Sequence, residues 1–311
     1  MMKLKLYVHI VICMLIFNTL EAQQMPQYSQ WASHQFALNP AHAGIKKCID
    51  LQTLYRAQWV GFEGAPRSGF VTASVPLRSK RNKYLSARHG MGVKFEYDRI
   101  GQLGLNRFNL AYAGHFNFSK DTRLSLGLYG GMVQFGFDPT TATTISTDQA
   151  VLRDASNVSP DAHFGAWWNG LNYYAGLTLN QLIPSRWPMG NTSKQRIHAM
   201  MNAGYRFTLN EKLTLLPGVM IKIPFTGPIV YDLNLNLDIK NMVNLGLGFR
   251  NQDALIFMLG FKVKQQFSIQ YSYDVTISSL QKVSSNTHEI SIGFITCKPD
   301  KKGFANCSLF E

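Results

Sequence analysis

The side chains that most often carry enzyme chemistry are all present, but none falls in a spacing that builds a catalytic or metal site. No two histidines form the HExxH zinc motif, and no GxSxG nucleophile elbow occurs. The G-Q-L-G run at 101–104 lacks the third glycine of a dinucleotide fingerprint. We therefore expect neither an enzyme nor a cofactor or metal site, with a Ser/His/Asp set hidden inside a barrel as the alternative. The histidines are His9, His34, His42, His89, His115, His163, His198 and His288.

The four cysteines offer one candidate covalent link. Cys13 lies in an apolar leader, which leaves Cys48, Cys297 and Cys307 in the mature chain. Cys297 and Cys307 are a candidate disulfide if the protein folds in an oxidising compartment. The alternative of incidental or buried thiols stays open, because no CxxC or Cys/His metal spacing occurs.

Positive charge is densest between residues 78 and 89, and a second basic group follows in the C-terminal tail. Such groups are ordinary solvated loops in many proteins. They also form docking sites for acidic proteins or for anionic lipid headgroups. The docking hypothesis applies to Arg78, Lys80, Arg81, Lys83, Arg88, Lys298, Lys301 and Lys302.

The first 22 residues have the pattern of a cleaved secretory signal peptide. Lys3 and Lys5 precede a mostly apolar stretch from Leu6 to Leu20, and Ala22 precedes the expected cleavage point. The apolar stretch is short for a transmembrane helix, which needs about 20 residues. Export argues against nucleic acid as a partner, although the net charge is +13.

From about residue 48 the chain alternates apolar with small or polar residues, as in RFNLAYAGHFNF at 107–118 and DLNLNLDI at 232–239. Only 16% of the residues are charged, against about 25% in typical globular chains, and aromatic residues reach 12%. The alternation alone fits a soluble sandwich as well as a membrane barrel. The signal peptide, the aromatic content and the pattern of the connections favour the barrel. In such a barrel the apolar face meets lipid and the polar face lines the lumen.

The alternating segments predict an all-β fold, a transmembrane antiparallel β-barrel of about fourteen strands. Tight connections alternate with long ones, such as 135–159 and 182–195, and the long connection at 78–89 is the one exception. Outer-membrane barrels have short periplasmic turns and long outer loops, so this alternation predicts that both termini are periplasmic. The predicted parts are a signal peptide at 1–22, an N-terminal segment at 23–47, the barrel at 48–297 and a periplasmic tail at 298–311. The N-terminal segment is interpreted as a lumenal plug or a partner-binding leader, with a disordered leader as the alternative.

Three charged residues fall inside predicted strands: Arg56, Asp274 and Glu289. A lipid-facing arginine at mid-depth destabilises a barrel by roughly 2–4 kcal/mol, so we expect these side chains to face the lumen. The first and last strands must meet to close a barrel, which allows Arg56 to lie near Glu289. We interpret the three as a closure-stabilising group in preference to a functional site.

Three stretches carry motifs that together cover nearly the whole mature chain. They are PQYSQWASHQFALNPAHAG at 26–44, TLYRAQWVGFEGAPRSGFVTASVPL at 53–77 and YSYDVTISSLQKVSSNTHEISIGF at 271–294. They resemble the PorP/SprF family of type IX secretion and gliding-motility proteins of Bacteroidetes. The resemblance implies an outer-membrane component that associates with a PorK- or GldK-like periplasmic ring lipoprotein and its ring partner. For some members it implies a secreted adhesin-type cargo with a type B C-terminal domain. The tail at 298–311 departs from the short aromatic ending of the family.

The leading functional hypothesis is an integral outer-membrane component of the type IX protein secretion and gliding machinery that docks other proteins and contacts outer-membrane lipid. The alternative is an outer-membrane channel or transporter for small solutes or fatty acids, because a fourteen-stranded barrel with a plug suits that role too. A weaker alternative is a surface adhesin anchor that acts through the 135–159 loop.

Overall fold

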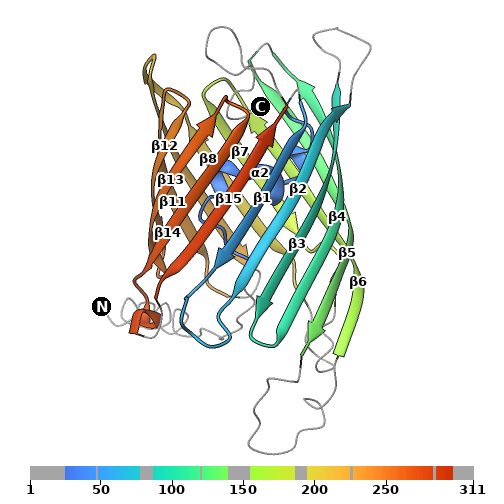
Figure 1. Ribbon diagram of the computed structural model, residues 1–311. Coiled ribbons are helices and arrows are strands. Elements are labelled where there is room, and N and C mark those ends of the chain that lie inside the picture. The colour runs from blue at the N-terminus through green and yellow to red at the C-terminus, as the bar shows by residue number, and fades with distance from the viewer. Residues whose placement is uncertain are drawn as a thin grey trace, which may run out of the picture.

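The computed structural model describes residues 25–46, 48–77, 87–119, 121–138, 155–185, 195–224, 227–282 and 285–296. Most of these residues are β-strand, arranged as one antiparallel barrel (Figure 1). Among them, no helix is long and apolar enough to span a membrane. The strands are β1 (Asp50–Ala57), β2 (Arg67–Leu77), β3 (Arg88–Ile100), β4 (Leu103–Asn117), β5 (Arg123–Phe137), β6 (Ala155–Asn169), β7 (Tyr173–Asn180), β8 (His198–Tyr205), β9 (Phe207–Asn210), β10 (Leu213–Pro224), β11 (Val230–Ile239), β12 (Val243–Arg250), β13 (Ala254–Val263), β14 (Phe267–Thr276) and β15 (Thr287–Ile295).

Two of the fifteen strands are pieces of one barrel strand. β8 and β9 both pair with β10, and only Arg206 separates them. The described sheet therefore has fourteen barrel positions, which confirms the number that the sequence predicts.

The barrel closes between its first and last strands. Asp50 of β1 lies opposite Ile295 of β15, and the antiparallel register continues to Ala57 opposite His288. An unpaired strand edge would leave N–H and C=O groups unsatisfied in hydrocarbon, so closure is a condition for a membrane-spanning sheet.

The two faces of the wall are chemically opposite, as the alternation predicts. In β4, Phe108 and Leu110 are 46% and 56% exposed on the outside, whereas Asn109 between them is fully buried on the inside. In β11, the outward leucines alternate with inward Asp232 and Asp238 in the same way. The apolar outer face suits lipid, and the polar inner face lines a lumen that the chain itself fills.

The connections give the barrel two distinguishable ends. We call the end with the β1–β2, β5–β6 and β14–β15 connections the loop end; it includes the short helix η4 (Ser279–Lys282) and lies at the bottom of Figure 1. We call the opposite end the turn end. It carries the tight β9–β10, β11–β12 and β13–β14 connections, the start of β1 and the end of β15.

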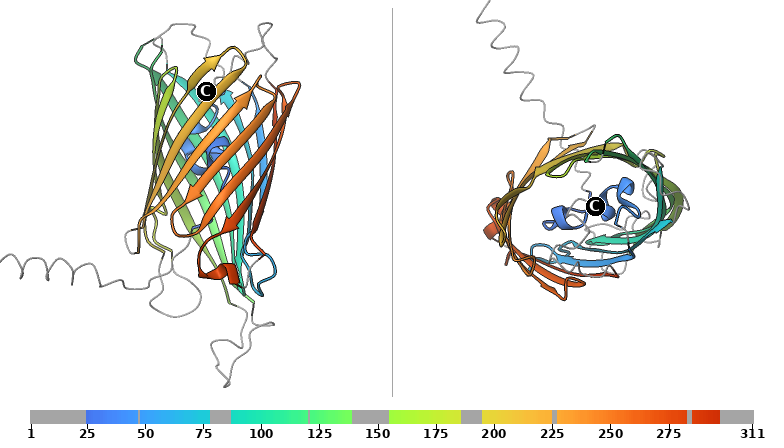
Figure 2. Two further views of the ribbon diagram at one scale, coloured as in Figure 1. Left: turned by 90° about the vertical axis from the view of Figure 1, so that its left-hand side faces the viewer. Right: turned by 90° about the horizontal axis from the view of Figure 1, so that it is seen from above.

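A plug occupies the lumen. It consists of residues 28–45, with three short helical turns: η1 (Trp31–Ser33), α2 (Gln35–Leu38) and η2 (Pro40–His42). The view along the barrel axis shows this segment surrounded by the wall (Figure 2, right). Trp31 is 1% exposed, and Ala41 and Ala43 are fully buried. Of the three interpretations of the N-terminal segment, the structure therefore shows lumenal placement for these residues.

Candidate functional site

The plug runs along the lumen from the loop end to the turn end. Ser29 contacts Glu289, only two residues from the loop-end start of β15. The carbonyl of Ala43 accepts a hydrogen bond from His115, two residues before β4 ends at the turn end. The expectation was that both termini lie at one end. In the described chain, Ser29 lies at the loop end and Thr296 at the turn end, while the termini themselves lie outside the described residues.

The three charged strand residues singled out in the sequence meet at the closing seam. Arg56 lies 2.8 Å from Asp274 and 3.0 Å from Glu289, and all three side chains are at most 1% exposed. Register explains the meeting, because Arg56 is paired directly with Glu289 across β1 and β15. We call these three residues and the plug residue Ser29 the closing cluster.

The closing cluster also binds the plug backbone. The carboxylate of Glu289 accepts hydrogen bonds from the backbone N–H groups of Ser29 and Gln30, at 2.9 and 2.8 Å. The Ser29 hydroxyl donates to Asp274 at 2.6 Å and accepts from Arg56 at 2.8 Å. Hydrogen bonds that involve ionised groups are the stronger kind, so the seam of the barrel and the start of the plug stabilise each other.

Further charges extend this network around the wall. Arg250 lies 3.1 Å from Asp232 and 3.5 Å from Asp274, and it also donates to the Ser29 hydroxyl at 3.2 Å. Lys222 lies 2.8 Å from Asp232. Charges buried this deeply require partners, and here the wall supplies a partner for each cation.

A second charged group, the mid-wall cluster, lies on β3, β4 and β6. Arg107 lies 2.6 Å from Glu96 and 2.9 Å from Asp161, and the Lys94 ammonium lies 3.4 Å from Glu96. Lys94 donates to the plug carbonyl of Ala37 at 3.1 Å. The plug residue Tyr28 donates its hydroxyl to Glu96 at 3.0 Å. The mid-wall cluster therefore holds the plug at two further points.

Sequence reasoning missed the mid-wall cluster, although a signal for it exists. Lys94, Glu96 and Asp98 alternate with apolar residues in β3, which places all three on the inner face. Arg107, the partner of Glu96, lies directly opposite it on the next strand. The alternation gives the face of each charge, but only the register gives its partner.

Near the turn end, close packing replaces charge. A methyl group built on Gly127 of β5 would collide with Pro40 and Ala41 of the plug, and one on Gly165 of β6 with Asn39. The Asn39 side chain donates to the wall carbonyls of β6 and β7 and caps η2 by accepting the N–H of Ala41. Glycine is required in the wall here because the plug backbone at Gly127, and plug side chains at Gly165, approach too closely for a β-carbon.

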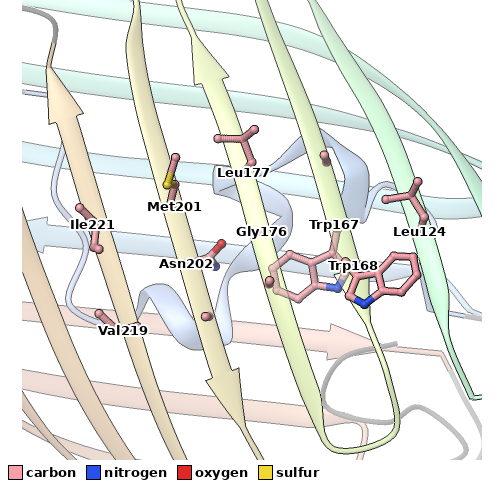
Figure 3. Close-up of a pocket in the computed structure, with 12 residues that line it drawn as sticks. Leu124, Trp167, Trp168, Gly176, Leu177, Met201, Asn202, Val219 and Ile221 are labelled. Carbon is pink, nitrogen blue, oxygen red and sulfur yellow. The ribbon is translucent and has the colours of Figure 1, made fainter.

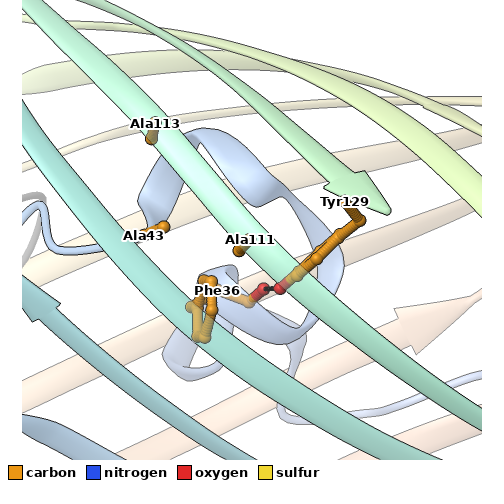
Figure 4. Packing of buried hydrophobic residues seen from close by; sticks show 5 residues of the cluster. All are labelled: Phe36, Ala43, Ala111, Ala113 and Tyr129. Carbon is orange, nitrogen blue, oxygen red and sulfur yellow. Dashed lines mark hydrogen bonds between the residues drawn. The ribbon is translucent and has the colours of Figure 1, made fainter. Parts of the chain in front are cut away.

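Aromatic and small side chains complete this packing (Figure 4). Phe36 of the plug packs with Tyr129 of β5 and with Ala111 and Ala113 of β4. The Tyr129 hydroxyl donates to the carbonyl oxygen of Phe36. Small wall residues thus make room for one large plug residue, which fixes the depth of the plug in the lumen.

The lipid-facing wall has an apolar groove of about 390 Å³ over β6, β7, β8 and β10 (Figure 3). Trp168, Ala175, Ala203 and Val219 are neighbours across these strands, so two small side chains lie between two large ones. The groove arises from this difference in side-chain size.

Most of the predicted partner-binding residues lie outside the described residues. These are Arg78, Lys80, Arg81, Lys83, Lys298, Lys301 and Lys302, and the same holds for Cys297 and Cys307. Arg88 is half-buried at the start of β3, at the turn end. Cys48 is disulfide-bonded, whereas the sequence offers Cys297 and Cys307 as the candidate pair. Within the described ranges, no three His, Cys, Asp or Glu residues are grouped to hold a metal ion.

The closed antiparallel sheet, the apolar outer face and the filled lumen define an outer-membrane β-barrel with an internal plug. The family model of the type IX secretion system membrane protein PorP/SprF matches residues 20–294, and the chain belongs to this family. A search of curated proteins finds no match.

The solved structures that align with this chain include a monoaromatic hydrocarbon channel and a FadL homologue. The CymD monoaromatic hydrocarbon channel aligns over 87% of this chain and 93% of its own, with 10% identity and a TM-score of 0.50. A Pseudomonas aeruginosa FadL homologue aligns over 87% of this chain and 94% of its own, with 11% identity and a TM-score of 0.48. At 10% identity, the likeness to the CymD channel concerns the barrel fold alone.

Proposed function

We propose that this barrel serves the type IX machine as a docking component, with its turn end facing the periplasm. Its partners there are a periplasmic ring lipoprotein of the PorK or GldK kind and the ring partner of that lipoprotein. A secreted adhesin-type cargo with a type B C-terminal domain is a further partner. The observation that carries this proposal is a closed barrel of a PorP/SprF family member whose lumen is occupied by its own N-terminal segment.

The anchored plug favours docking over transport of solutes. The plug is held by the closing cluster and the mid-wall cluster, and it fits closely against the wall glycines. Its residues Trp31 and Phe36 are buried in the lumen. A conducting barrel would have to displace these contacts. In this proposal the chain catalyses no reaction, and its rigid filled barrel presents surfaces to partners.

The lengths of the connections support this orientation. The described β9–β10, β11–β12 and β13–β14 connections at the turn end are tight, as periplasmic turns are in outer-membrane barrels. The chain leaves β2 at Leu77 and enters β3 at Arg88 at this same end. The basic segment between them and the tail after β15 are therefore attached to the proposed periplasmic side.

Co-purification tests the docking role. We would reverse the charges at Arg78, Lys80, Arg81 and Lys83 in the full chain and isolate it from native membranes. The expected result is loss of the ring lipoprotein from the purified complex. The control reverses three described basic residues of the loop end, Arg67, Arg99 and Lys282. Equal recovery of the ring lipoprotein from both variants would exclude docking through this segment.

Site-specific labelling tests the orientation. Lys264→Cys places a thiol in a turn-end connection, and Lys282→Cys places one in η4 at the loop end. A membrane-impermeant maleimide applied to intact cells should label only the loop-end variant. Labelling of Lys264→Cys in intact cells would show that the turn end faces outward.

Planar-bilayer conductance separates the docking component from the channel alternative. We expect no steady conductance from the purified wild-type barrel, because the plug occupies its lumen. A steady, solute-selective pore in the wild type would favour the channel.

A further inference from the structure

Three successive connections at the turn end each carry an exposed lysine. Lys212 lies between β9 and β10, Lys240 between β11 and β12, and Lys264 between β13 and β14. The connections are neighbours in space. The backbone N–H of Lys240 donates to the carbonyl of Lys212 at 2.6 Å, and that of Lys262 donates to the carbonyl of Met242 at 2.7 Å. We call Lys212, Lys240 and Lys264 the lysine rim.

Two of these lysines occupy backbone conformations that disfavour them. Lys240 and Asn241 have φ of 53° and 51°, and Lys264 and Gln265 have φ of 51° and 55°. Two successive positive φ values mark type I′ hairpin turns, in which Asn-Gly is the preferred pair. The left-handed backbone conformation is less favourable for lysine than for glycine, because the β-carbon of lysine crowds the following carbonyl oxygen. Turn chemistry therefore does not explain the choice of lysine.

The ammonium groups of the lysine rim form no ion pair within the described part of the protein. There, none of the three lysines has a carboxylate within ion-pair distance, although Glu211 adjoins Lys212 in sequence. The adjacent Lys262 is a contrast, because its ammonium lies 3.1 Å from Asp238 and donates to Asn241 at 2.9 Å. The rim ammonium groups are thus available to a ligand.

The rim borders directly on strongly apolar surface. Met242 is 56% exposed beside Lys240, and Val263 is 57% exposed beside Lys264. Leu209 is 59% exposed just before the Lys212 turn. A lysine in this position can keep its carbon chain along the apolar surface while the ammonium reaches the headgroup layer. If the lysine rim bound a protein partner in water, these neighbouring apolar side chains would remain exposed to water. A lipid surface would cover them.

We propose that the lysine rim binds the phosphate groups of anionic phospholipids in the leaflet at the turn end. Basic residues near an anionic membrane surface each contribute about 1 kcal/mol, which corresponds to roughly fivefold in lipid affinity per lysine. The site goes beyond docking of secretion partners. Its test uses only the purified barrel, so it succeeds or fails independently of the proposed function.

The experiment is native mass spectrometry of the full mature chain in detergent with equal phosphatidylglycerol and phosphatidylcholine. The wild type should retain phosphatidylglycerol preferentially. K212Q/K240Q/K264Q should lose most of that preference. R67Q/R99Q/K282Q removes the same charge from the loop end and should keep it. Equal losses in the two triple variants, or no preference in the wild type, would overturn the proposal.

A second variant separates lipid binding from folding. K240N/K264N places the residue that tolerates positive φ best after glycine in both turns. It should unfold at the same or a higher temperature while its phosphatidylglycerol preference falls several-fold. Full retention of the preference in this stable variant would contradict the proposal. Displacement of the lipid by millimolar inorganic phosphate would also contradict it, because the site would then recognise the free ion.

Discussion

At the loop end the plug is held by ionised side chains, whereas near the turn end it is held by close contact with glycines of the wall. Ser29 is surrounded by Arg56, Asp274 and Glu289, which belong to the closing strands. Pro40 lies against Gly127, where a side chain of any size would collide. The first region joins the plug to barrel closure, and the second positions the plug by shape.

The difference predicts different responses to mutation. Removing Arg56 leaves Glu289 without its cation in a low dielectric, although Arg250 still lies 3.5 Å from Asp274, and the seam should be weakened. Enlarging a wall glycine leaves the seam intact and should affect only the seating of the plug. Three variants, in order of expected effect, test this comparison.

Arg56→Ala should have the largest effect. It leaves Asp274 and Glu289 facing each other without their shared cation, and loss of a buried partner typically destabilises a protein by about 3–5 kcal/mol. The measurement is urea unfolding of the refolded barrel in detergent. The control is Arg99→Ala, which breaks the exposed pair with Asp138 and should change stability by less than about 1 kcal/mol. Similar stability of the two variants would refute the structural role of the closing cluster.

Gly127→Val should have an intermediate effect, about 1–3 kcal/mol, because overpacking strains the contact with the plug. The control is Gly130→Val in the same strand, where an added β-carbon meets nothing within 4 Å. A cysteine introduced at Ala41 should be labelled faster in the Gly127 variant than in the control. Identical labelling rates would mean that wall glycines do not position the plug.

Ser29→Ala should have the smallest effect, about 1 kcal/mol, because it removes the hydroxyl but keeps the backbone N–H bonded to Glu289. A double-mutant cycle with Arg56→Ala should show a coupling energy of at least about 0.5 kcal/mol, as expected for groups in one network. Strict additivity would indicate that Ser29 and Arg56 act separately.

Several features were predictable because each depends on local pattern. The alternation in β4 and β11 gave the two faces of the wall, and the segment count gave the number of barrel strands. The inward position of Arg56 followed from its strand and from the free-energy penalty for charge in lipid. The mid-wall cluster was missed because its members lie on three strands, and their pairing depends on register.

The sequence by itself determined an alternating chain of about fourteen strands, the faces of their side chains and the membership in the PorP/SprF family. Only the tertiary structure decided which charges pair, that the N-terminal segment fills the lumen, and that its two halves are held by different forces. The physical reason is distance along the chain. Ser29 and Glu289 are 260 residues apart, and only closure of the barrel brings them within hydrogen-bonding distance.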